Sequence, residues 1–120
     1  MSKIRQQRTA HQIQMILSEL CQRELRDPRL QLLTITEVTI DRELQYADVY
    51  VNALGDESRR DEVMAALKKA TGFFRREVAH RLRLRTAPQL IFHWDPTLAQ
   101  AERVHQILNS LEIPPVDEEE

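Results

Sequence analysis

The 120-residue sequence has one cysteine, two glycines and no long apolar run, and these scarcities exclude several classes of protein. Cys21 alone allows no disulfide within the chain, so we expect a cytoplasmic location, where thiols stay reduced. Gly55 and Gly72 are too far apart for a glycine-rich loop that holds nucleotide phosphates. No segment approaches the roughly 20 apolar residues of a membrane helix, and the first residues lack the apolar run of a secretory signal. We therefore expect no membrane association.

Catalytic and metal-binding patterns are also missing. The four histidines have no metal-type spacing with one another or with the cysteine. The carboxylates fall at predicted helix starts, in a hairpin turn and in the C-terminal tail, where capping and solubility explain them. We therefore expect no enzyme activity, no metal and no cofactor.

The length and composition indicate one globular domain. The chain is 42% hydrophobic and 30% charged, and its length lies within the usual range of a single domain. We expect this domain to span residues 1–112, followed by an acidic, disordered tail over residues 113–120.

The formal net charge of −2 hides a strong segregation of charge along the chain. Residues 1–30 carry six basic and three acidic side chains, and residues 68–86 carry seven and one. By contrast, residues 31–67 carry three basic and eight acidic side chains, and residues 87–120 carry one and seven. This separation favours a surface that binds a polyanion such as nucleic acid. The alternative is that basic and acidic segments neutralise each other in the fold.

The first half of the sequence predicts a long helix and a β-hairpin. Apolar residues at three- and four-residue spacing predict a helix over about residues 5–26, ended by the Asp-Pro pair at 27–28. Residues 32–53 lack that period, and their second half alternates as a half-buried strand with Asn52 on the polar side. A change of parity predicts a bulge near Thr36. Residues 41–44 are typical of a hairpin turn.

The second half predicts two more helical stretches around a short strand. Ser58, followed by acidic residues, is typical of a helix start, and the apolar stripe then continues to about residue 84. Glycine inside a helix costs about 1 kcal/mol relative to alanine, so Ala70, Thr71 and Gly72 predict a kink or a break. Residues 90–94 alternate as a strand, and Asp95 with Pro96 begins a last helix. The predicted fold is α+β, with three strands and four helices.

The basic residues of the second half gather on one side of their helix. Arg76, His80 and Arg83 project together at i, i+4 and i+7, opposite the apolar stripe. On a helical wheel of the first helix, Arg8 and Arg26 share one direction and lie roughly 27 Å apart. A solvated helix face explains the first helix equally well. Tyrosines on the polar side of the second strand could stack RNA bases or lie beneath a neighbouring side chain; they are Tyr46 and Tyr50.

Four segments, in this order, resemble the bacterial ribosome-binding factor A family. They are QRELRDPRL at 22–30, DRELQYADVYV at 41–51, ATGFFR at 70–75 and LRLRTAPQL at 82–90. The entry into the last helix at residues 95–98 also matches. No single segment is diagnostic, whereas all of them in order are specific.

This resemblance implies a type II KH fold with the order α-β-β-α-kink-α-β plus a C-terminal helix, and with helices on one face of a three-stranded sheet. The Ala-Thr-Gly kink then replaces the GxxG loop of other KH domains. The family members are not enzymes; they bind the free 30S ribosomal subunit, assist processing of the 5′ end of its 16S rRNA and support growth in the cold. They work alongside assembly GTPases. For this chain we expect a monomer.

We expect the basic helical face to lie along folded rRNA and to recognise its shape and phosphates more than its base sequence. We also expect Gly72→Val to lower stability and binding together, because Gly72 belongs to the kink. The candidate rRNA-binding residues are Lys69, Arg76, Arg81, Arg83 and Arg85 around the third helix, and Arg5, Arg8, Arg26 and Arg29 around the first.

Two other functions remain open from the sequence. A ribosome-associated translation inhibitor or hibernation factor would prefer 70S ribosomes or mature subunits. A protein-interaction adaptor would use the acidic segments and would bind without RNA. Salt dependence separates the adaptor from both RNA-binding functions, because each neutralised phosphate releases counterions.

Overall fold

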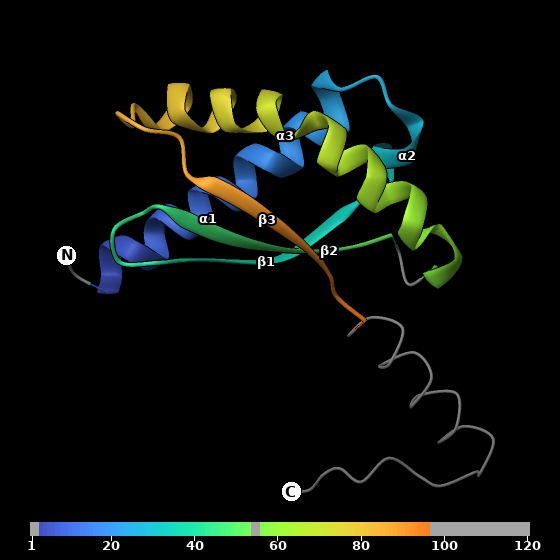
Figure 1. The fold of residues 1–120 in the computed structure, drawn as a ribbon, viewed down its shortest axis with the longest axis horizontal. Helices are drawn as coiled ribbons and strands as arrows, with labels where there is room; N and C mark the ends of the chain where they lie inside the picture. The colour runs from blue at the N-terminus through green and yellow to red at the C-terminus, as the bar shows by residue number, and fades with distance from the viewer. Residues whose placement is uncertain (1–2, 54–55, 97–120) are drawn as a thin grey trace, which may run out of the picture.

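The computed structural model describes residues 3–53 and 56–96, in which helices pack against a three-stranded sheet (Figure 1). The predicted last helix and the acidic tail at 113–120 lie outside these residues. In chain order the elements are α1 (Lys3–Glu19), η1 (Leu20–Glu24), α2 (Pro28–Gln31), β1 (Thr34–Ile40), β2 (Tyr46–Asn52), η2 (Glu57–Arg59), α3 (Arg60–Leu82) and β3 (Gln89–Trp94).

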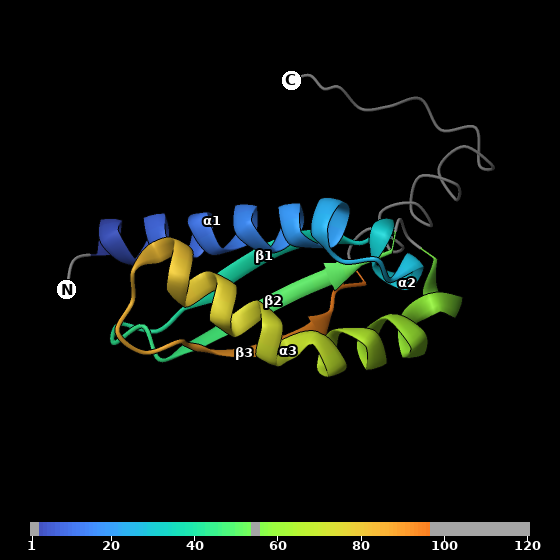
Figure 2. The same cartoon turned by 90° about the horizontal axis from the view of Figure 1, so that it is seen from above.

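The three strands form one sheet in the order β1-β2-β3, with β1 antiparallel to β2 and β2 parallel to β3. A parallel pair needs a long crossover connection, and α3 supplies it. Helix α1 packs along β1, α3 packs along β3, and the two helices meet, so that they cover one face of the sheet (Figure 2). This is the predicted α+β, KH-like fold.

The core lies between that covered face and the two helices. Phe74 of α3 is fully buried and meets Phe92 of β3 with ring centroids 5.8 Å apart. Alternate residues of β2 point toward the helices, as the sequence predicts, and have no exposed surface. The most deeply buried residues of the three elements are Ala47, Val49 and Val51 of β2, Ile13 and Leu17 of α1, and Val63, Leu67 and Val78 of α3.

The predicted bulge and hairpin turn are both confirmed. The register between β1 and β2 shifts between Ile35 and Glu37, so Thr36 is the extra residue. In the turn, the Asp41 carboxylate accepts hydrogen bonds from the backbone N–H groups of Gln45 and Tyr46, at 2.6 and 2.8 Å. The bulge keeps the apolar residues on both of its sides pointing into the core, despite their different parity.

The first helix ends earlier than predicted. The α-helix stops at Glu19, and a π-helical turn follows in which the Leu25 N–H donates to the Leu20 carbonyl at 2.9 Å. Arg26 therefore lies beyond the helix and does not continue the stripe that Arg8 begins, so that prediction is wrong. The apolar spacing misleads because a π turn also places residues five apart on one face. The short helix α2 was not predicted.

Two local predictions near the second strand need correction. The helical start uses Asp56 instead of Ser58: its carboxylate accepts from the Ser58 N–H at 3.1 Å and from the Ser58 hydroxyl at 2.6 Å. Asn52, predicted on the polar side, is fully buried. Its Nδ2 donates to the Asp95 carbonyl at 2.6 Å, which gives the buried amide a hydrogen-bond partner.

Helix α3 bends but does not break. It runs without interruption from Arg60 to Leu82 and changes direction about half way along (Figure 1). The Thr71 hydroxyl donates to the Leu67 carbonyl at 3.0 Å, and such bonds often bend helices. A Cβ built on Gly72 would meet only the Arg76 guanidinium, at an ordinary contact distance of 3.6 Å. The bend therefore does not depend on the small size of glycine. Of the two predicted alternatives, the kink is confirmed and the break is wrong.

Candidate nucleic-acid interface

The solvent-facing side of α3 carries the cations that the sequence places there. Arg76 and His80 are exposed, whereas Phe74 and Val78 on the opposite side are fully buried. Arg83 follows the last turn in a left-handed conformation with φ of 54°, and its N–H donates to the His80 carbonyl at 3.3 Å. A cation at this position lies at the negative end of the helix dipole. Packing of the buried side thus holds both arginines toward solvent.

Arg81, one of the predicted rRNA contacts, is engaged in ion pairs within the protein. Its guanidinium contacts Glu24 at 2.5 Å, Glu19 at 3.2 Å and Glu77 at 3.3 Å. The hydrogen bond to Glu24 is the main reason why the pKa of Arg81 is raised above its ordinary value. These contacts join α3 to the end of α1 and to η1. The side chain is only 27% exposed, so it stabilises the helix pair and offers little surface to a phosphate.

Arg29 is also committed within the protein. Its Nε and Nη2 donate to the two carboxylate oxygens of Asp27, at 3.0 and 2.7 Å. This fork is the first cause of the lowered pKa of Asp27. The Arg59 guanidinium donates to the Arg29 carbonyl at 3.1 Å and so ties α2 to η2. The structure therefore uses Arg29 to shape α2.

A further arginine of the basic segment, Arg75, has a structural role that the sequence does not reveal. Its Nε donates to the Pro88 carbonyl and its Nη2 to the Ala87 carbonyl, both at 3.0 Å. Both acceptors belong to the loop before β3, which follows twelve or thirteen residues later in the sequence. The seven cations of residues 68–86 therefore divide into two that hold the fold and five with exposed side chains, which are Lys68, Lys69, Arg76, Arg83 and Arg85.

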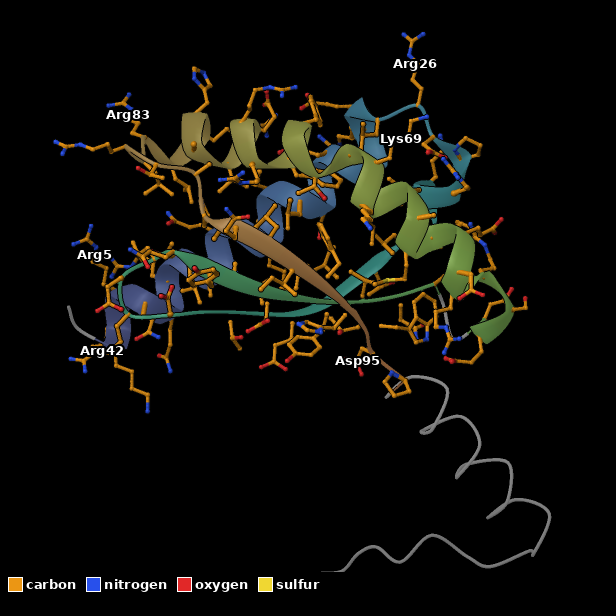
Figure 3. The ribbon with its side chains drawn as sticks, in the orientation of Figure 1. Arg5, Arg26, Arg42, Lys69, Arg83 and Asp95 are labelled. Atoms are coloured by element: carbon orange, nitrogen blue, oxygen red, sulfur yellow. The ribbon has the colours of Figure 1, made fainter. Side chains whose placement is uncertain are left out.

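Other cations project at two ends of the molecule (Figure 3). Arg26 and Lys69 project near α2, whereas Arg83 lies at the far end of α3. Arg5 and Arg42 project at the same end as Arg83. Arg42 was not among the predicted residues, although its position in a polar hairpin turn indicates that its side chain is exposed. Arg8 and Arg85 are exposed as well.

Of the two predicted stacking tyrosines, one already has a partner. Tyr50 stacks on His93 with ring centroids 4.9 Å apart, and the His93 Nε2 lies 2.8 Å from a carboxylate oxygen of Asp48. Tyr46 is 52% exposed. Tyr50 therefore packs against a neighbouring side chain, which is the second of the two alternatives that the sequence left open.

The described residues contain no arrangement suited to catalysis on a metal. Within residues 3–53 and 56–96, no three histidine, cysteine or acidic side chains gather closely enough to hold a metal ion. Burial raises the pKa of the Cys21 thiol to about 12, so the thiol stays protonated and unreactive near neutral pH. In the same part of the chain, no helix combines the length and apolar character that a bilayer crossing needs.

Sequence comparison agrees with this geometry. The family model described as ribosome-binding factor A matches residues 5–108. A protein of Chromohalobacter salexigens named ribosome-binding factor A is 40% identical over 107 residues, which cover 88% of this chain and 82% of that protein.

Solved structures give the same result. The crystal structure of ribosome-binding factor A from Thermus thermophilus is similar with a TM-score of 0.64 and 32% identity, over 73% of this chain and 93% of that one. The solution NMR structure of a Thermotoga maritima protein, described as a ribosome binding factor A, gives 0.67 and 38%, over 78% and 89%. A third match, with 0.57 and 34% over 69% and 87%, is the Thermus protein as fitted into a cryo-EM map of its complex with the 30S subunit.

Proposed function

Because the chain belongs to the ribosome-binding factor A family, we propose that it binds the free 30S subunit through 16S rRNA. The observation that carries this proposal is the side of α3 on which Arg76 is exposed, with Arg83 exposed directly after the helix, while Phe74 and Val78 fill the core. The Thermus relative, fitted into a 30S complex, supports the small subunit as the partner.

The proposed binding mode follows from the chemistry of arginine. A guanidinium presents a planar fork that matches two phosphate oxygens, and such contacts position a protein without reading base sequence. The cations at both ends of the molecule, Arg26 with Lys69 and Arg83 with Arg85, then span a folded RNA surface. Recognition depends on the shape in which the RNA presents its phosphates.

We further propose that this binding assists maturation of the subunit, including processing of the 5′ end of 16S rRNA. We also propose that it supports growth in the cold. The protein would favour an immature rRNA arrangement, because a ligand shifts an equilibrium only by its differential affinity for the two states. Release follows when mature rRNA no longer presents the phosphates in that arrangement. The protein acts as a monomer in the cytoplasm, alongside assembly GTPases and without catalysis of its own.

The test is co-sedimentation of the protein with free 30S subunits, 50S subunits and 70S ribosomes at two salt concentrations. We expect salt-sensitive binding to free 30S subunits only. The Arg76→Ala/Arg83→Ala variant should bind at least about tenfold more weakly, and its slope of log K against log salt should fall by about 1 to 2.

Arg60→Ala is the matched control, because Arg60 is an exposed arginine of the same helix that lies beside Asp61 among acidic residues. It should bind like the unmodified protein. Preference for 70S ribosomes would instead indicate a translation inhibitor or hibernation factor. Binding that changes neither with salt nor in the Arg76→Ala/Arg83→Ala variant would indicate a protein-interaction adaptor.

A further inference from the structure

A groove of about 830 Å³ lies between α1 and β1, at the edge of the sheet that α3 does not cover. Its size falls within the range of small-ligand sites. It is separate from the exposed side of α3, and none of the nine predicted rRNA-binding residues lines it. The side chains that give it its chemical character are Lys3, Gln6, Gln7, His11, Gln14 and Arg42.

Two of its glutamines are held in fixed orientations by the edge strand. The Gln6 Nε2 donates to the Ile40 carbonyl at 2.5 Å, and the Gln14 Nε2 donates to the Ile35 carbonyl at 2.8 Å. Because a carbonyl can only accept a hydrogen bond, the amide nitrogen of each glutamine must face it. The amide oxygen then points away and can accept a hydrogen bond from another donor. The same two bonds occupy carbonyls at both ends of β1, which leaves little room for an added peptide strand.

The charges of the groove are arranged along its length. Lys3 and Arg42 lie toward the hairpin end, and Figure 3 shows Arg42 projecting there, at the same end of the molecule as Arg5. Glu37 lies about 10 Å back along β1 from the end of the strand at Ile40, at 3.3 Å per residue. An anion is therefore favoured at the hairpin end and disfavoured at the other.

We propose that this groove binds one unpaired nucleotide of the RNA, with its phosphate near Lys3 and Arg42 and its base along α1. The proposal rests on the proposed RNA-binding function and adds a second contact to it. Amides that donate and accept hydrogen bonds match the edges of an unpaired base, and the exposed imidazole of His11 offers a ring for stacking. The order of charges along the groove sets the direction in which the nucleotide lies.

The experiment is an NMR titration of the full chain, labelled with ¹⁵N, with the single-stranded RNA hexamers of adenosine, cytidine and uridine. We expect at least one hexamer to shift backbone resonances of α1 and β1. The substitutions Gln7→Ala and His11→Ala should each weaken this binding at least about fivefold, in keeping with the loss of a stacking or base contact. Lys3→Ala/Arg42→Ala should weaken it and reduce its salt dependence.

Gln12→Ala is the matched control, because Gln12 is an exposed glutamine of the same helix that does not line the groove. It should leave the affinity for the hexamer unchanged. Hexamers that shift no resonances of α1 or β1, or that shift only those of α3, would overturn the proposal.

The proposals for the groove and for the exposed side of α3 can be disproved separately. The Arg76→Ala/Arg83→Ala variant should still show the hexamer shifts in α1 and β1. Sedimentation with 30S subunits tests the α3 face by itself, so loss of hexamer binding with intact subunit binding overturns the groove alone. A hexamer bound without any subunit binding would overturn the proposed function instead.

Discussion

The Thr36 hydroxyl donates a hydrogen bond of 2.5 Å to the Asp95 carboxylate, although the two residues are 59 positions apart in the sequence. Thr36 is the bulge residue of β1, and Asp95 follows the end of β3. The Asp95 N–H also donates to the Val51 carbonyl at 2.7 Å. One aspartate therefore ties together all three strands at the same end of the sheet.

We expect Thr36→Val to lower the free energy of unfolding by about 1 to 2 kcal/mol, because a hydrogen bond to a carboxylate is lost while the side chain keeps its shape. Urea denaturation monitored by circular dichroism measures this change. Thr39→Val, on an exposed position of the same strand, serves as the comparison and should have a small effect. Equal effects of the two substitutions would contradict a special role for this bond.

Arg81→Met should lower the free energy of unfolding by about 1 to 2 kcal/mol, because it removes the partner of three carboxylates at the junction of α1, η1 and α3. The carboxylates left behind repel one another, so added salt should reduce the loss. Arg76→Met should leave stability nearly unchanged. An Arg81→Met protein that is fully stable but binds 30S subunits poorly would restore Arg81 as an RNA contact.

Arg83→Gly separates the backbone of this position from its charge. Glycine adopts the left-handed φ of 54° without strain, so thermal stability should stay the same or rise by up to about 1 kcal/mol. The affinity for 30S subunits should fall because a cation is lost. Differential scanning calorimetry and sedimentation measure the two effects. A loss of stability together with affinity would mean that the Arg83 side chain supports the fold.

Gly72→Ala should raise the free energy of unfolding by about 0.5 to 1 kcal/mol, because alanine is the better helix former and its Cβ has room. Subunit binding should be unchanged. This differs from the expectation for Gly72→Val that the sequence suggested, since the helix continues through this position. A lower melting temperature for Gly72→Ala would show that the bend needs glycine after all.

The Cys21 thiol should react slowly with Ellman's reagent at pH 8 in the folded protein and rapidly in urea. Burial raises its pKa to about 12, so at pH 8 almost none of the reactive thiolate is present until the chain unfolds. The absorbance of the released thiolate dye follows the reaction. A fast reaction without denaturant would mean that α1 and η1 open locally.

The strands, their bulge and the exposed side of α3 could be predicted because their signals lie within a few neighbouring residues. Alternation and parity locate Thr36, and helical spacing separates Arg76 from Phe74. The roles of Arg81 and Arg75 could not be predicted in full, since all of their partners except Glu77 lie outside α3. Glu24, for example, is 57 positions away from Arg81. Sequence thus identifies which cations are available, whereas packing decides which of them remain at the surface.

The parallel pairing of β2 with β3 has a consequence for synthesis on the ribosome. A parallel strand can pair only after its crossover helix has been made. The β1–β2 hairpin therefore has no third strand until residues 89–94 emerge. Until then Phe74 lacks Phe92, its partner in β3. A nascent chain that ends before this strand contains every cation of α3 without the packing that aligns them. The face proposed to bind RNA is therefore completed late in translation.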